Sequence, residues 1–257
     1  MNKKQRIYRD FFMPIRVREY EDMLSYAKDK GYEFHTLRSF VQLPSVDKNK
    51  KYIILRRDVD TASNRVQRKM LQAEINNGAR CSSYFRKNTL NKSLMRQIES
   101  NGGEASYHYE EIATWCYKHR ERRKEVVLEH LEDFRSMFVQ NVAKIRKKYN
   151  VPVLTVSSHG EYINRKLDID NQIIVNERVL RDSGILIDAY DKDYLCKCTV
   201  RIHDHDRENF IDAVKKAIDE GEHVIEVLTH PRQWGAAFIT NLLDDINRVC
   251  KQLYMKL

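Results

Sequence analysis

The chain is poor in glycine and proline and has no long apolar run. Only 8 glycines and 4 prolines occur among 257 residues, which leaves little room for disordered linkers. No apolar run approaches the roughly 20 residues that a membrane-spanning helix needs. The basic start, Met1 to Arg6, does not lead into the apolar core of a signal peptide. We therefore expect a protein that stays in the cytoplasm and does not span a membrane.

Cysteine is also scarce and irregularly spaced. The five cysteines make an odd number and show no repeated Cys-x-x-Cys spacing. This pattern argues against both a disulfide framework and a cysteine-ligated zinc cluster.

The basic residues outnumber the acidic ones, giving a formal net charge of +9. The charges are spread along the chain, and the densest run, Lys118 to Lys124, contains an acid. A solvated helix face explains such a run, and attraction to an acidic or phosphorylated substrate is the alternative. No nucleic-acid partner is expected.

Short β-rich runs alternate with helical patterns from about residue 50 onward. The runs are rich in Val, Ile, Tyr and Thr and are bounded by turn residues. The predicted strands are 52–56, 81–85, 104–107, 153–157, 185–189, 199–202 and 224–229. Apolar residues at steps of three and four predict helices near 20–27, 90–98, 127–145, 210–217 and 238–253. Such alternation favours a mostly parallel sheet, either an incomplete barrel or an open doubly wound sheet.

Acidic residues and histidines follow these strands. Asp58 and Asp60 follow the first strand, and Asp188 lies near the end of the fifth. His108, His159, His203 and His230 follow four of the others. The carboxyl ends of strands in a parallel barrel face one rim, where active sites form. We therefore expect these side chains to meet in one mouth.

This constellation favours metal or acid–base chemistry. Asp58 and Asp60 are two residues apart, so on an extended segment they point to the same side. A cation beside two neighbouring carboxylates relieves their repulsion. Imidazoles and one carboxylate as three ligands, with a fourth position open, are typical of catalytic zinc. Simple capping of the helix that follows Asp60 is the structural alternative.

Four segments of the sequence resemble successive motifs of the polysaccharide deacetylases, carbohydrate esterase family 4. They are Ile53-Ile-Leu-Arg-Arg-Asp-Val-Asp60, Gly103-Glu-Ala-Ser-Tyr-His-Tyr-Glu110, Ser157-Ser-His-Gly160 and Leu228-Thr-His-Pro231. The branch that they most resemble is associated with bacterial surface-polysaccharide synthesis. The resemblance implies a distorted, incomplete (β/α) barrel with about seven parallel strands. It also implies a single domain over residues 1–257, with a helical leader at 1–48 and the barrel at 49–257.

The resemblance further implies roles for individual residues. Asp58 matches the catalytic base, and His230 matches the acid that protonates the leaving group. Asp60, His108 and His159 match ligands of a divalent metal, for which zinc is expected. The implied reaction is removal of an N- or O-acetyl group from a sugar, which is free, nucleotide-linked or lipid-linked.

Further residues are assigned to substrate binding or to support of the site. Arg56 shares a strand side with Asp58 and is expected to orient it, and Glu110 is expected to bond a ligand histidine. Trp234 is expected either to stack on a sugar or to lie in the core. Asp188 and His203 complete this group, whereas the histidines in helical or loop contexts are interpreted as structural: His35, His119, His130, His205 and His223.

The sequence departs from the family pattern at three positions. Ile112 replaces a second ligand histidine, so that His159 has to supply the missing ligand. Arg57 and Gly103 stand where relatives of this branch carry histidine. These departures leave open a catalytically weakened carbohydrate-binding protein, or a metal-dependent hydrolase of another amide or ester.

Overall fold

All the strands lie in one parallel sheet. The computed structural model describes residues 3–205 and 207–254, and its strands are all paired in parallel. The strand order is β6-β5-β4-β3-β2-β8-β7, with β1 pairing with β2 outside this path. The strands are β1 (Tyr32–His35), β2 (Lys51–Val59), β3 (Ser82–Phe85), β4 (Glu104–Tyr109), β5 (Thr155–Ser158), β6 (Ile187–Asp188), β7 (Val200–His203) and β8 (Val224–Thr229).

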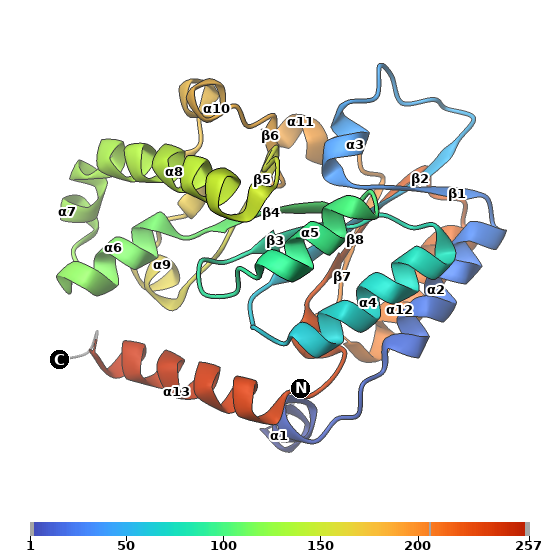
Figure 1. The fold of residues 1–257 in the computed structure, drawn as a ribbon, viewed down its shortest axis with the longest axis horizontal. Helices are drawn as coiled ribbons and strands as arrows, with labels where there is room; N and C mark the ends of the chain where they lie inside the picture. Colours follow the sequence, from blue (N-terminus) through green and yellow to red (C-terminus); the bar gives the residue numbers. More distant parts are fainter. Residues whose placement is uncertain (1–2, 206, 255–257) are drawn as a thin grey trace.

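The sheet curls into an incomplete barrel, as predicted (Figure 1). Arg56 on β2 donates a hydrogen bond of 2.7 Å to Ser157 on β5. Tyr84 on β3 likewise contacts Thr155 on β5 at 2.7 Å. Two strands separate β2 from β5 in the sheet, so the first of these contacts is possible only because the sheet bends round on itself.

The seven predicted strands are all present, and the structure adds an eighth. β1 lies within residues 1–48, which were expected to be a helical leader. β1 and β3 pair with successive halves of the same edge of β2, while β8 pairs with the other edge. The leader therefore contributes a strand to the sheet and is not wholly helical.

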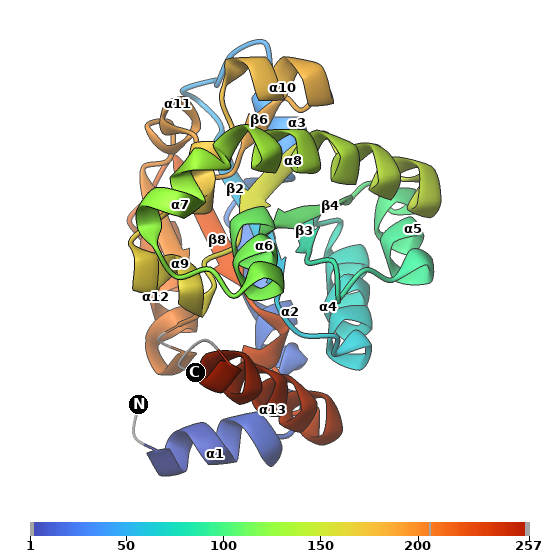
Figure 2. The ribbon, with the colours of Figure 1, turned by 90° about the vertical axis from the view of Figure 1, so that its left-hand side faces the viewer.

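Helices surround the curled sheet, and α1 and α13 lie together at one end of it (Figures 1 and 2). They are α1 (Lys3–Phe11), α2 (Val17–Asp29), α3 (Leu37–Val41), α4 (Asn64–Asn77), α5 (Lys92–Ser100), α6 (Glu111–His119), α7 (Lys124–Glu129), α8 (Leu131–Ile145), α9 (Tyr162–Leu167), α10 (Glu177–Ser183), α11 (Lys192–Leu195), α12 (Arg207–Asp219) and α13 (Phe238–Tyr254). Three short segments complete the chain: a π-helix at Arg146–Asn150 and 3₁₀ turns at Asn171–Ile174 and Pro231–Gln233. None of the helices in the described ranges is both long enough and apolar enough to cross a bilayer.

Strand β2 organises the two faces of the sheet because it is buried along nearly its whole length. Ile53 and Leu55 pack in the layer below α2, α4 and α12. Tyr52 and Ile54 point to the opposite side, inside the barrel. Successive side chains of a strand alternate between faces, so Arg56 and Asp58 also point inside.

Helix α13 is present as predicted, but its apolar stripe is not buried. Phe238, Leu242, Ile246, Val249 and Leu253 are all at least 40% exposed. The opposite side of the helix carries charged residues that line a cleft at the mouth of the barrel. The periodicity of the apolar residues predicted this stripe correctly. The charged side of α13 faces the cleft, so the apolar stripe faces solvent.

Candidate metal centre and cleft

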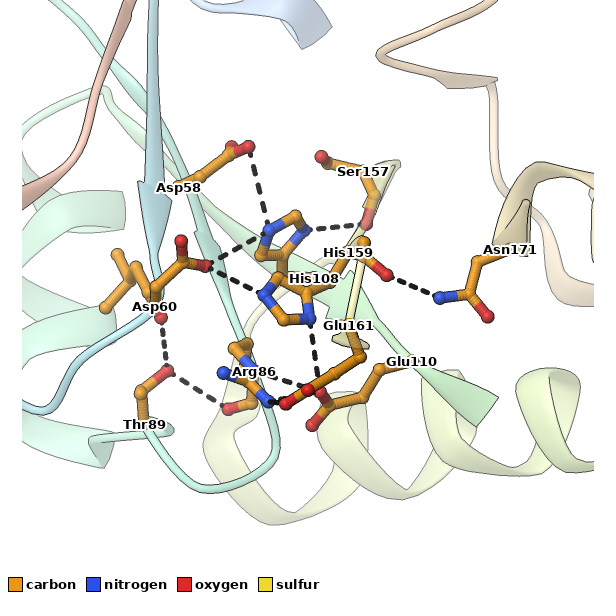
Figure 3. A network of polar contacts seen from close by, with 12 residues as sticks. Asp58, Asp60, Arg86, Thr89, His108, Glu110, Ser157, His159, Glu161 and Asn171 are labelled. Atoms are coloured by element: carbon orange, nitrogen blue, oxygen red, sulfur yellow. Dashed lines mark hydrogen bonds and ion pairs between the residues drawn. The ribbon is translucent and has the colours of Figure 1, made fainter. Parts of the chain in front are cut away.

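Asp60, His108 and His159 come together at the mouth of the barrel (Figure 3). Each offers a ligand atom, and these atoms lie within 4.8 Å of one another. Asp60 Oδ1 is 3.4 Å from His108 Nε2 and 3.5 Å from His159 Nε2. Asp60 Oδ1 is buried and has no hydrogen-bond partner among the described residues. Two ring nitrogens and one carboxylate oxygen therefore converge on one point.

The parallel register explains why residues distant in sequence meet there. Asp60 directly follows β2, His108 is in β4, and His159 directly follows β5. His108 is level with Ser157 in the pairing of β4 with β5. The strands all run the same way, so their carboxyl ends form one rim.

The hydrogen bonds of His108 fix its tautomer. His108 Nδ1 lies 2.9 Å from the carbonyl oxygen of Ser157. A carbonyl can only accept, so Nδ1 carries the proton in this bond. In the neutral ring, Nε2 then presents its lone pair toward Asp60, as a metal ligand must.

His159 is supported from its other nitrogen. His159 Nδ1 lies 3.3 Å from Glu110 Oε2, although this contact is not well enough aligned to count as a hydrogen bond. Arg86 holds the same carboxylate with a 2.9 Å bond from Nε. Burial would raise the pKa of Glu110, but His159 and Arg86 outweigh it and lower the pKa to about 2. Glu110 is therefore an anion beside the ligand histidine.

Arg56 donates two parallel hydrogen bonds to Asp58 inside the barrel. Arg56 Nε donates to Asp58 Oδ1 at 3.0 Å, and Nη2 donates to Oδ2 at 2.7 Å. Asp58 Oδ2 also lies 3.6 Å from His108 Nε2. Burial raises the pKa of Asp58, yet Arg56, and after it His108, bring the pKa below its ordinary value. Asp58 is thus ionised and held beside the three converging ligand atoms.

His230 is held by a buried aspartate that sequence reasoning missed. Asp204 accepts a 2.7 Å hydrogen bond from the backbone N–H of His230 and lies 2.7 Å from its Nδ1. Trp234 Nε1 donates to the same carboxylate at 2.9 Å. Burial alone would lower the pKa of His230, but Asp204 and, more weakly, Asp60 and Asp58 raise it to about 9. The sequence feature that could have indicated Asp204 is its position directly after His203 and before His205, at the end of a predicted strand.

Two other residues lie at this side of the mouth, and for Trp234 the structure agrees with the core position, one of its two alternatives. Trp234 is wholly buried, which excludes stacking on a sugar; its indole N–H instead holds Asp204. His205 is exposed and stacks on His230 with ring centroids 4.8 Å apart. It also lines the cleft, which its loop position in the sequence did not predict.

Asp188 and His203 lie near the site without joining the three ligands. Tyr109 donates a 2.7 Å hydrogen bond to Asp188. Burial raises the pKa of Asp188 to about 6. His203 is half-buried at the end of β7, where burial and Arg201 lower its pKa.

Asp60, His159 and His230 open onto one cleft of about 270 Å³. Helix α13 contributes Asp245 and Arg248 to its opposite wall. Six of the lining residues are basic and five are acidic, and many of them pair with one another, as do Arg86 and Glu161 at 2.8 Å. The cleft is therefore strongly polar, which suits a hydroxyl-rich or charged ligand.

The three departures from the family pattern have structural explanations. Ile112 is fully buried in the core, so no polar ligand could stand there without disturbing the packing. Arg57 points to the opposite face of β2 from Asp58 and pairs with the buried Glu74. A Cβ added to Gly103 would lie 2.8 Å from Ile98 Cγ2, so a histidine does not fit in this packing.

No family model matches the chain, and no curated protein matches it. Among the solved structures that the chain is similar to are the wild type of a CE4 family pseudoenzyme from Bacillus anthracis and a mutant of a CE4 family pseudoenzyme with restored enzymatic activity. The mutant is 15% identical with a TM-score of 0.46, covering 80% of this chain and 65% of its own. The wild type is 14% identical with a TM-score of 0.45, covering 80% of this chain and 63% of its own. This chain thus spans less than two thirds of the length of either structure.

Proposed function

We propose that this protein is a metal-dependent hydrolase that removes an acetyl group from an amino sugar or sugar conjugate in surface-polysaccharide metabolism. The observation that carries the proposal is the convergence of Asp60, His108 and His159 on one point of a polar cleft. Asp58 and His230, the two remaining residues of the resembling motifs, flank that point.

The residues present fit a divalent metal. The buried Asp60 Oδ1 lacks a hydrogen-bond partner and faces two imidazole nitrogens. One oxygen and two nitrogens suit zinc and similar ions. A bound ion would polarise the acetyl carbonyl and supply an activated water at neutral pH.

The other two groups of acidic residues and histidines at the mouth fit a metal less well. Glu110, His159 and Glu161 surround Arg86, whose guanidinium already pairs with both carboxylates. Asp204 of the third group already accepts hydrogen bonds from His230 and Trp234. The first group is therefore the metal site that we propose.

The chain's own residues supply the proton transfers. Asp58 is ionised and fixed by Arg56, so it takes a proton from the attacking water. His230 is protonated at neutral pH because of Asp204, so it gives a proton to the departing nitrogen or oxygen. Substrate linkage, the native metal and the cytoplasmic location expected from the sequence stay predictions.

Metal content and acetate release test this proposal together. Protein reconstituted with zinc is expected to hold one equivalent and to release acetate from nucleotide-linked N-acetyl sugars. Less than roughly a tenth of an equivalent after reconstitution would contradict the metal site. Stoichiometric metal without acetate release would favour the carbohydrate-binding protein. Stoichiometric metal with turnover of phosphoesters would favour a hydrolase of another substrate class.

The pH profile tests the role of Asp204. The raised pKa of His230 means that the protonated acid is present below about pH 9 and is lost above it. We therefore expect kcat/KM to fall as the pH rises through about 9. Asp204→Asn removes the charge that raises this pKa, so the alkaline limb should move down by about one pH unit or more. If the alkaline limb of the Asp204→Asn variant stayed at the same pH while the variant kept its metal, Asp204 would not set the proton affinity of His230.

A further inference from the structure

Helix α13 turns its polar side toward the protein and its apolar side toward solvent. Asp244, Asp245, Arg248 and Lys251 line the cleft. On the other side, Ile239 is 72% exposed and Leu243 is 61% exposed. A surface helix of a globular protein ordinarily does the reverse. Figure 2 shows α13 lying across the mouth end of the barrel, beside α1.

Helix α1 extends the same apolar surface. The rings of Phe11 and Phe12 lie 5.4 Å and 6.4 Å from that of Phe238 at the start of α13. Asn241 of α13 also donates a hydrogen bond to the backbone carbonyl of Asp10. Phe12 is 64% exposed. We call the resulting surface the α1/α13 apolar face, defined by Tyr8, Phe12, Ile239, Leu243, Ile246 and Val249.

A continuous apolar surface of this kind marks an interaction site. In the sequence, residues 1–12 carry four basic residues and a single acid, Asp10. Arg9 pairs with Asp10 and lines the cleft, whereas Lys4 is exposed. Basic residues together with an exposed apolar helix face are typical of segments that lie in the surface of an anionic bilayer. A second copy of the chain is a poorer occupant, because pairing through this face would bring two chains of net charge +9 together at their basic segments.

We propose that the α1/α13 apolar face binds the surface of anionic phospholipid membranes. The apolar side chains enter the boundary between headgroups and acyl chains, and the basic residues attract anionic headgroups. The polar side of α13 then keeps the cleft next to the bilayer surface. This inference rests on the exposed face and its charge, and it holds whether or not the proposed deacetylase activity is correct.

Vesicle co-sedimentation with the full chain tests it. We expect binding to vesicles of equimolar phosphatidylglycerol and phosphatidylcholine, weakened by high salt. The double variant Ile239→Gln, Leu243→Gln removes apolar contact without changing charge, so binding should fall roughly tenfold or more. Lys4→Gln should weaken it roughly fivefold.

The matched control is Leu128→Gln, Leu186→Gln, which changes two exposed leucines away from the face, 40% and 45% exposed. It should bind as the unaltered protein does. Equal binding by both double variants, or no binding to anionic vesicles, would overturn the proposal. A dimer seen by light scattering and dissociated by Ile239→Gln, Leu243→Gln would also overturn the proposal, because the face would then bind a second copy of the chain. None of these measurements depends on turnover, so they separate this inference from the proposed activity.

Discussion

Replacing His230 by alanine is expected to lower kcat by about 10²- to 10⁴-fold, and Asp58→Asn should do the same. Both residues are fixed by charged partners: Arg56 bonds to Asp58 at 2.7 and 3.0 Å, and Asp204 lies 2.7 Å from His230 Nδ1. Neither belongs to the three proposed metal ligands, so both variants should keep their metal. The measurement is kcat on an acetylated amino sugar together with zinc content.

The matched control for His230 is His205→Ala. His205 stacks on His230 and lines the same cleft, but it has no role in the proposed proton transfers. Its removal should leave kcat within a few-fold of the original. Full turnover in both Asp58→Asn and His230→Ala would refute the mechanism. If Asp58→Asn lost the metal while Asp60→Asn kept it, the roles of the two aspartates would be reversed.

The sequence pattern located most of the sheet because each strand is short, apolar and bounded by turns. It missed β1, which has only four residues and is only partly buried, with helices on both sides. It also could not give the direction of the apolar stripe on α13. An apolar stripe predicts only that one side of a helix is apolar. Which side of α13 faces the protein depends on the cleft at the barrel mouth, and residues from distant parts of the sequence form that cleft.

Most of the candidate site could be predicted because its residues lie at or just after the ends of predicted strands. Asp58, Asp60, His108, His159 and His230 all end at one rim, which follows from parallel strand direction alone. Asp204 was missed because its importance comes from contacts 26 and 30 residues away, with His230 and Trp234. Local spacing does not reveal such contacts, and the chemical roles of these residues remain predictions.

The proposed metal site explains Ile112 and His159 together. Ile112 lies in the core, and His159, which directly follows β5, lies 3.5 Å from Asp60. In the proposed metal site, His159 after β5 supplies the ligand that Ile112 of α6 cannot supply. Glu110 directly precedes α6, and its Oε2 lies 3.3 Å from His159 Nδ1.

His108→Ala is expected to lose the metal and the activity together, with zinc affinity falling by more than about 100-fold. His108 is 2% exposed, and the Nδ1 bond to Ser157 leaves only Nε2 to face Asp60. Removing the ring therefore deletes one of three ligands, and no other histidine is oriented to replace it among the residues that line the described cleft. Zinc titration followed by elemental analysis gives the affinity without reference to turnover.

Glu110→Gln provides the graded comparison for this experiment. It keeps the shape of the side chain but removes the anion beside His159, so zinc affinity should fall by about 10- to 100-fold, less than in His108→Ala. His119→Ala is the matched control, because His119 is exposed and bonds only to the backbone of its own helix in the described structure. It should bind zinc as the unaltered protein does. If His108→Ala kept stoichiometric zinc of unchanged affinity, the metal would have to bind elsewhere, and the site built on Asp60, His108 and His159 would be wrong.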